Sequence, residues 1–183
     1  MKLPPPVPAA IRERLLQAFA RLTSFVEGVV RLYPEEVACR PGCDACCRQE
    51  LRLRGVEAAY VLEGARQLLP EAISLVWATL SAPDSEVCPL LQGGTCLVYE
   101  HRPAVCRSHG LPMVRRGGGG ALLHHCPENF RSVDASLLPP SSLLDEERLC
   151  VLMDALDALY ARETGWEGER ISVAELLRRG LRP

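Results

Sequence analysis

The spacing of cysteines constrains this chain more than any other feature of its sequence. Four cysteines lie within nine residues, and four more follow before residue 127. They are Cys39, Cys43, Cys46 and Cys47, and then Cys88, Cys96, Cys106 and Cys126. So many thiols in one short region indicate either a metal-binding cage or a disulfide framework.

Several observations favour reduced thiols over disulfides. Residues 1–8 are proline-rich and carry neither the apolar stretch nor the cleavage site of a secretory signal. Nine cysteines is an odd number, so at least one thiol stays unpaired in any all-disulfide scheme. The adjacent Cys46 and Cys47 also suit a single disulfide poorly, because disulfide geometry is strict. We therefore expect a cytoplasmic protein that binds a metal through thiolates.

Composition narrows the classes of partner. The chain has 183 residues, a length that suits a single domain with its own core. Its net charge is −2, and only 5% of its residues are aromatic. It therefore lacks both the basic surface and the stacking platforms typical of nucleic-acid readers. No uncharged apolar run approaches the roughly 18 residues of a membrane span, so we expect no membrane partner.

Hydrophobic periodicity predicts helices on both sides of the cysteines. Apolar residues recur at intervals of three and four over residues 9–32, and this helix should end near Tyr33, before Pro34. The same pattern predicts core helices over 56–68 and 73–80. Ser142 and Asp145 open a predicted helix over 143–160, and Ser172 with Glu175 starts a short final helix.

The centre of the chain lacks the helical periodicity of its flanks. Proline and glycine recur from residue 83 to 140, so we expect no regular helix there. Residues 111–115 and 121–125 flank four glycines, a pattern that predicts a β-hairpin. The fold class is therefore mainly α, with helices flanking an irregular cysteine-rich metal-binding centre and a small β-hairpin. We expect one domain over 1–183, with a proline-rich tail 1–8, a metal-binding core 39–130 and C-terminal helices 141–180.

Sulfur ligands indicate the class of metal. Thiolates select zinc, cuprous copper or iron–sulfur clusters over magnesium or calcium. Gaps of two to four residues between cysteines suit both zinc and iron–sulfur sites, so spacing leaves the metal open. Eight thiols could form two four-thiolate zinc sites, one four-iron cluster with spare thiols, or one binuclear cage.

The order of residues around these cysteines resembles a known family. Its elements here are Cys39-x3-Cys43-x2-Cys46-Cys47, Cys88-Pro89-Leu90-Leu91, Gly94-x-Cys96, Tyr99-Glu100 and Arg102-Pro103-x-x-Cys106-Arg107. This arrangement resembles the YkgJ-type cysteine cluster family, also called CxxCxxCC, whose members are zinc- or iron-chelating domain proteins. The first spacing departs from the family pattern, because three residues rather than two separate Cys39 from Cys43.

The resemblance implies a bound zinc or iron, with a 4Fe-4S cluster as one form. The predicted metal ligands are Cys39, Cys43, Cys46, Cys47, Cys88, Cys96, Cys106 and Cys126, of which Cys39 and Cys126 are the additions to a six-cysteine cage. Some relatives look like part of flagellin lysine N-methylase. The alternative function is therefore an iron–sulfur-dependent redox or methyl-transfer enzyme, or its accessory subunit.

Other side chains near the cysteines complete the candidate site. His109 and His125 are candidate imidazole ligands. Arg102 and Arg107 bracket Cys106 and either offset thiolate charge or pair with Glu100 or another carboxylate. Cys150 lies on the apolar stripe of the helix over 143–160, so we expect it to be buried and structural. The sequence contains no catalytic constellation that we recognise, and a metal-binding protein is favoured over an enzyme.

Overall fold

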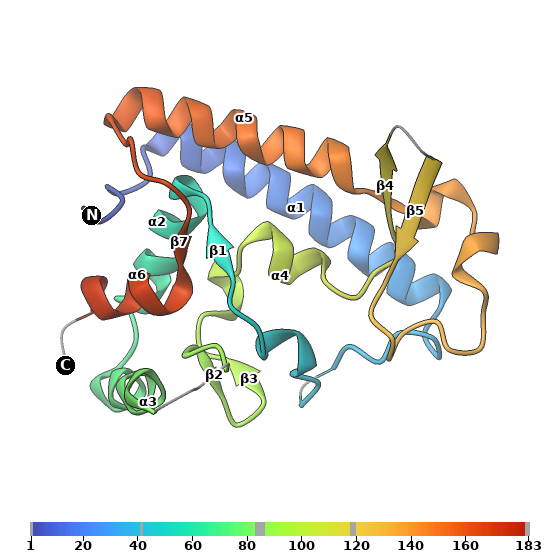
Figure 1. The fold of residues 1–183 in the computed structure, drawn as a ribbon, viewed down its shortest axis with the longest axis horizontal. Coiled ribbons are helices and arrows are strands. Elements are labelled where there is room, and N and C mark those ends of the chain that lie inside the picture. Colours follow the sequence, from blue (N-terminus) through green and yellow to red (C-terminus); the bar gives the residue numbers. More distant parts are fainter. Residues whose placement is uncertain (1, 41, 83–86, 118–119, 182–183) are drawn as a thin grey trace.

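Two long helices run side by side along one side of the molecule (Figure 1). The computed structural model describes residues 2–40, 42–82, 87–117 and 120–181. Helix α1 (Ala9–Leu32) buries one face, including Leu15, Phe19 and Leu22, and ends before Pro34 as predicted. Helix α5 (Glu146–Thr164) lies beside it and buries Met153, Leu156 and Tyr160.

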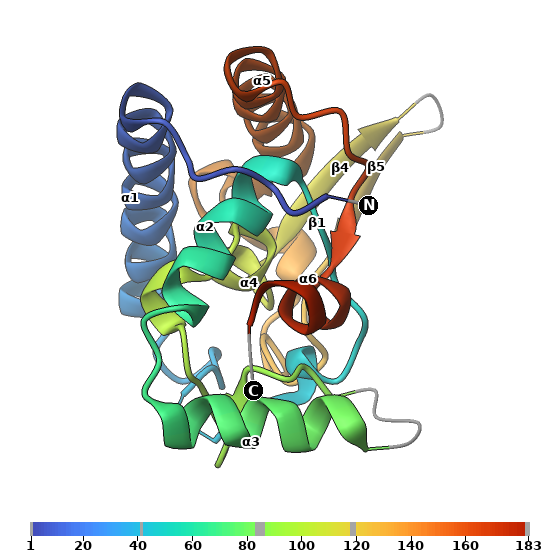
Figure 2. The same cartoon turned by 90° about the vertical axis from the view of Figure 1, so that its left-hand side faces the viewer.

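Helix α2 (Gly55–Ala65) is the central helix of the fold. Nearly every one of its residues is buried, because α5 and α6 (Val173–Gly180) pack on different sides of it (Figure 2). Helix α3 (Pro70–Ser81) starts with Pro70 in its first turn and buries only Val76 and Leu80. The prediction of two core helices is therefore confirmed for α2, whereas α3 lies at the surface.

A polar side chain caps the N-terminus of each C-terminal helix by accepting a backbone hydrogen bond. The Asp145 carboxylate accepts from the Arg148 backbone N–H at 3.0 Å, so Asp145 rather than Ser142 caps α5. The predicted start at residue 143 is wrong because Leu144–Asp145 forms strand β6. The start of α6 is confirmed, since the Ser172 hydroxyl accepts from the Glu175 N–H at 3.2 Å.

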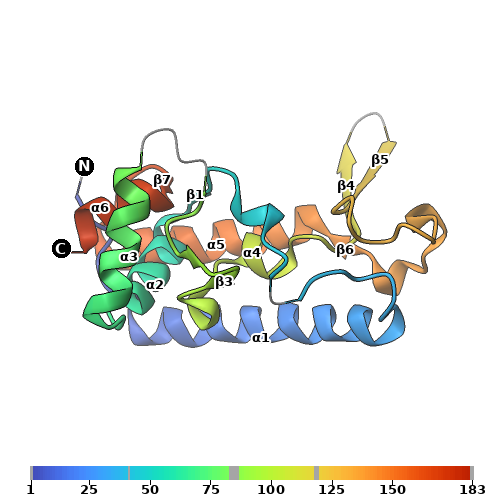
Figure 3. The ribbon, with the colours of Figure 1, turned by 90° about the horizontal axis from the view of Figure 1, so that it is seen from below.

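Short strands complete the fold. Strands β4 (Met113–Gly117) and β5 (Gly120–His124) form the predicted antiparallel hairpin, and β6 adds to β4 in parallel. This hairpin projects from the end of the molecule opposite α3 and α6 (Figure 3). Its predicted glycine tip includes Gly118 and Gly119, which lie outside the described residues. Two further antiparallel pairs are β1 (Arg52–Leu53) with β7 (Ile171–Ser172), and β2 (Leu91–Gln92) with β3 (Thr95–Cys96).

The cysteine-rich centre is mostly irregular, with one correction to the prediction. Helix α4 (Ala104–Ser108) interrupts the region 83–140 and packs on α1. It is too short for periodicity to reveal, and the buried Glu57 carboxylate accepts from its first N–H, at Ala104, over 2.8 Å. The mainly α fold with a small hairpin is thus confirmed.

The N-terminal segment also packs against the fold. Val7 is buried, and the Tyr160 hydroxyl donates to the Pro5 carbonyl at 2.5 Å. In the described part of the chain, no helix combines the length and the apolar character that crossing a membrane requires.

Candidate metal centre

The first cysteine segment is held against the later ones by its backbone. Gly42 has a φ of 93°, a conformation that favours glycine, and its N–H donates to the Gly94 carbonyl at 3.2 Å. The Cys88 N–H donates to the Cys47 carbonyl at 2.7 Å. These two bonds bring residues far apart in the sequence side by side.

Five half-buried thiols collect around this junction, and we name them the inner thiol group. Its members are Cys46, Cys47, Cys88, Cys96 and Cys106. Cys46 and Cys47 lie in a 3₁₀ turn over Ala45–Cys47, Cys96 lies on β3 and Cys106 on α4. The inner thiol group therefore draws on three separate parts of the chain.

The electrostatics of the inner thiol group show how closely its members interact. Burial, followed by repulsion from Cys88 and Cys96, raises the pKa of Cys106 to about 12. Burial likewise raises the pKa of Cys88 to about 11. A hydrogen bond between the two side chains raises the pKa of Cys46 and lowers that of Cys47. Burial and mutual repulsion therefore disfavour the thiolate forms of Cys88 and Cys106.

A second set, the outer thiol group, consists of Cys39, Cys43 and Cys126. Burial first, and then the neighbouring sulfurs of Cys39, Cys126 and Cys46, raise the pKa of Cys43. Gly110 has a φ of 93° and lies against Cys39 of this group. A larger residue would crowd that thiol, because a Cβ at position 110 would lie 3.1 Å from the Cys39 sulfur. Cys46 connects the two groups, since it interacts with both Cys43 and Cys47.

Asn129 organises the outer thiol group and was missed by the sequence analysis. Its buried side chain accepts from the Ala38 N–H at 2.9 Å and donates to the Gly110 carbonyl at 2.7 Å. The same amide nitrogen donates to the Cys39 sulfur at 3.5 Å. The only signal in the sequence was the position of Asn129 in the conspicuous run Cys126-Pro127-Glu128-Asn129.

The two arginines that bracket Cys106 have different surroundings. The pKa values of Cys96 and Cys106 are raised mainly by burial, and that of Cys46 mainly by its hydrogen bond with Cys47; the charge of Arg102 opposes all three shifts. Its guanidinium stacks 3.4 Å from the centre of the Tyr99 ring and donates to the Tyr99 carbonyl. Arg102 is therefore the cation positioned to offset thiolate charge.

Arg107 has a structural environment instead. Its guanidinium lies over the Phe19 ring and donates to the backbone carbonyls of Arg102 and Glu100. In the part of the chain that the structure describes, no ion pair joins Arg102 or Arg107 to the Glu100 carboxylate. Arg107 thus secures the turn before α4 against α1.

Among the residues that the structure describes, neither His109 nor His125 hydrogen-bonds to a cysteine sulfur. Burial, and to a lesser degree the charge of His124, lowers the pKa of His109 at the end of α4. His125 contacts the carbonyl of Cys126 at 2.9 Å through Nδ1 and packs edge-on against Phe130.

Cys150 corrects the sequence analysis, because it is exposed rather than buried. The inward face of α5 carries Met153, Leu156 and Tyr160, and Leu149 packs beside them. Successive residues of an α-helix lie about 100° apart around its axis, so Cys150 points away from the side on which Leu149 lies. The apolar stripe was therefore narrower than its leucines suggested.

All nine cysteines carry free thiols. Among the described residues, however, no three Cys, His, Asp or Glu side chains are arranged closely enough to hold a metal ion. In the described part of the chain, the eight predicted ligands gather in two thiol groups, the inner and the outer. The donor chemistry nevertheless fits zinc or iron, because soft sulfur atoms, partial burial and an adjacent guanidinium occur together.

Comparison with known proteins agrees with this donor set. Residues 38–127, which include all eight cysteines of the two groups, match the CxxCxxCC family model, described as "Putative zinc- or iron-chelating domain". No significant match was found among curated proteins or among solved structures. Through residues 38–127, the chain belongs to the CxxCxxCC family of zinc- or iron-chelating domains.

Proposed function

We propose that this protein binds zinc or iron through the thiolates of the inner thiol group. The outer thiol group, Cys39, Cys43 and Cys126, supplies the remaining predicted ligands. One observation carries the proposal: five half-buried sulfurs from three parts of the chain influence one another's ionisation beside Arg102. A structural role alone does not require thiols at all of these positions.

The raised thiol pKa values indicate what a metal contributes. Burial and repulsion between thiolates keep Cys88 and Cys106 protonated at neutral pH, because they raise the pKa values of these two thiols to about 11 and about 12. A divalent zinc or iron ion removes that repulsion and replaces the protons, which makes binding stronger at higher pH. Each thiol that coordinates loses its proton to solvent, and Arg102 offsets part of the remaining negative charge.

Ligation would draw sulfurs from several segments of the chain around the bound ion. The bonds from Gly42 to Gly94 and from Cys88 to Cys47 already hold the cysteine-bearing segments together. We infer that rotation of side chains and small shifts of residues 43–47 complete the ligand set. Metal binding should therefore stiffen this segment more than the flanking helices.

The number of thiols suits either a zinc ion or an iron–sulfur cluster. Four thiolates around zinc make a closed structural site, and an iron–sulfur cluster also takes four cysteines. The inner thiol group alone contains enough sulfurs for either. Both forms need reduced thiols, which supports a cytoplasmic location. No observation in the structure favours the redox or methyl-transfer alternative.

Elemental analysis of anaerobically purified protein tests the proposal. We expect zinc or iron bound in stoichiometric amount, and its loss in Cys46→Ser and in Cys106→Ser while the helical circular dichroism is retained. Cys150→Ser is the matched control, because this exposed thiol lies outside both groups, and it should keep its full metal content. Metal-free wild type, or unchanged loading in both inner variants, would overturn the proposal.

A further inference from the structure

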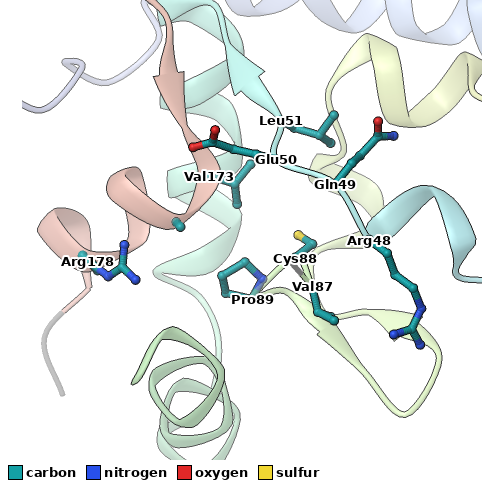
Figure 4. A pocket seen from close by; sticks show the side chains of 10 residues that line it. Arg48, Gln49, Glu50, Leu51, Val87, Cys88, Pro89, Val173 and Arg178 are labelled. Atoms are coloured by element: carbon teal, nitrogen blue, oxygen red, sulfur yellow. The ribbon is translucent and has the colours of Figure 1, made fainter. Parts of the chain in front are cut away.

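A pocket of about 550 Å³ opens directly beside the inner thiol group. Figure 4 shows Cys88 and Pro89 between Arg178 on one side and Arg48 on the other. Among the inner thiols, only Cys88 lines this pocket. A molecule that occupied it would therefore lie next to one of the proposed metal ligands.

The two arginines of the pocket have different hydrogen-bond and ion-pair partners. Arg48 pairs with the Asp44 carboxylate at 3.0 Å and is exposed. Arg178 is also exposed, but its guanidinium donates to the Leu80 carbonyl at 3.0 Å, which orients it. Within the described residues, Arg178 has no carboxylate partner, and Glu50 in the pocket wall pairs with neither arginine.

Apolar side chains form the wall between these charges. Val173 is buried at the start of α6, and Pro89 and Leu51 line the pocket with it. A pocket of this volume accommodates a small molecule, and small-molecule sites commonly combine apolar walls with few, well-placed polar groups. A planar guanidinium held in a fixed orientation pairs best with a carboxylate, through two parallel hydrogen bonds.

We propose that this pocket binds a small organic carboxylate. Its charged end pairs with Arg178, and a short apolar chain lies against Val173 and Pro89, within reach of Cys88. Binding itself depends only on the pocket, whereas the ligand's position beside a metal rests on the proposed function above. A doubly charged inorganic anion fits less well, because the apolar wall offers it no compensation for lost hydration.

Titration calorimetry with hexanoate, hexan-1-ol and inorganic phosphate tests this assignment on the full chain. Hexanoate should bind more tightly than the other two probes. Arg178→Gln, which keeps a side-chain donor for the Leu80 carbonyl, should weaken hexanoate binding roughly tenfold or more and leave hexan-1-ol unchanged. Arg162→Gln, an exposed arginine on α5 outside the pocket, is the matched control and should bind like wild type.

The outcomes separate this proposal from the proposed metal function. Equal binding of hexanoate and hexan-1-ol by the wild type overturns it without any variant, and so does phosphate binding as tight as that of hexanoate. In cobalt-loaded protein, hexanoate should also perturb the visible spectrum in wild type and not in Arg178→Gln. If the protein binds hexanoate but takes up no metal, the carboxylate site is supported and the proposed metal function is overturned.

Discussion

The side-chain amide of Asn129 donates to the sulfur of Cys39, with 3.5 Å between Nδ2 and Sγ. The same side chain bonds to the backbone at Ala38 and Gly110, so it joins three parts of the chain at the outer thiol group. Such a buried amide is costly to remove, because its partners lose their hydrogen bonds away from water.

Replacing Asn129 with alanine should destabilise the protein by about 1–3 kcal/mol, because the Ala38 N–H and the Gly110 carbonyl are left unsatisfied. Urea unfolding followed by circular dichroism measures this change in the free energy of unfolding. Gln17→Ala, which truncates an exposed amide on α1, is the control and should cost less than about 0.5 kcal/mol. Equal stability of both variants would show that the Asn129 network contributes nothing.

The buried carboxylate of Glu57 connects the core helix α2 to α4. Its Oε1 accepts from the Ala104 N–H at the start of α4, the helix that carries Cys106. Glu57→Ala should therefore lower the free energy of unfolding by about 1–3 kcal/mol and also weaken metal retention. Glu57→Gln keeps the acceptor and should hold metal like wild type. Metal content measured by elemental analysis in a chelator series checks both variants, and full retention in Glu57→Ala would contradict the link.

Cysteine reactivity in the metal-free protein should follow the thiol pKa values. Cys47 has a lowered pKa because Cys46 hydrogen-bonds to it, whereas burial raises those of Cys88 and Cys106 to about 11 and about 12. At pH 8 a thiol with a pKa of about 12 is ionised in about one molecule in ten thousand. We expect iodoacetamide to modify Cys47 well before Cys88 or Cys106.

Mass spectrometry of tryptic peptides over a time course measures the order of modification. Cys46→Ala removes the hydrogen-bond donor and should slow the modification of Cys47, while Cys150→Ala should leave its rate unchanged. Bound zinc should protect the inner thiol group and leave the exposed Cys150 reactive. Faster labelling of Cys106 than of Cys47 would contradict the assigned hydrogen bond.

The hairpin is attached to α5 by an acid-sensitive contact. Arg115 donates to both carboxylate oxygens of Glu146, at 2.9 and 2.5 Å, and His124 Nε2 contacts one of them at 2.9 Å. Arg115 first, and then His124, lower the pKa of Glu146 from 4.5 to about 2. A carboxylate whose folded pKa is depressed stabilises the fold above its ordinary pKa, and this contribution is lost as the pH falls from 4.5 towards 2.

Glu146→Gln should therefore be less stable than wild type at pH 6, by on the order of 0.5–1 kcal/mol because Arg115 is exposed. The difference should shrink as the pH approaches 2. Urea midpoints at pH 6, 4 and 2.5 measure it, with Glu128→Gln as the control for an exposed pair. A difference that is constant across this range would exclude an electrostatic origin.

Local sequence determined much of the secondary structure. The periodicity of α1, its end before Pro34 and the Ser172 cap of α6 all depend on residues within a few positions of one another. Thiol chemistry is equally local, so the class of metal follows from the residue type. These features were predictable because neighbouring residues decide them.

Only the tertiary structure decided how the cysteines group. Backbone bonds from Cys88 to Cys47 and from Gly42 to Gly94 connect segments that no periodicity relates. The same long-range packing exposes Cys150. The position of Arg178 in the pocket beside Cys88 likewise arises where α6 meets the segment before β2. Contacts between residues distant in the chain depend on the whole fold, because each is set by how the helices bury their apolar faces together.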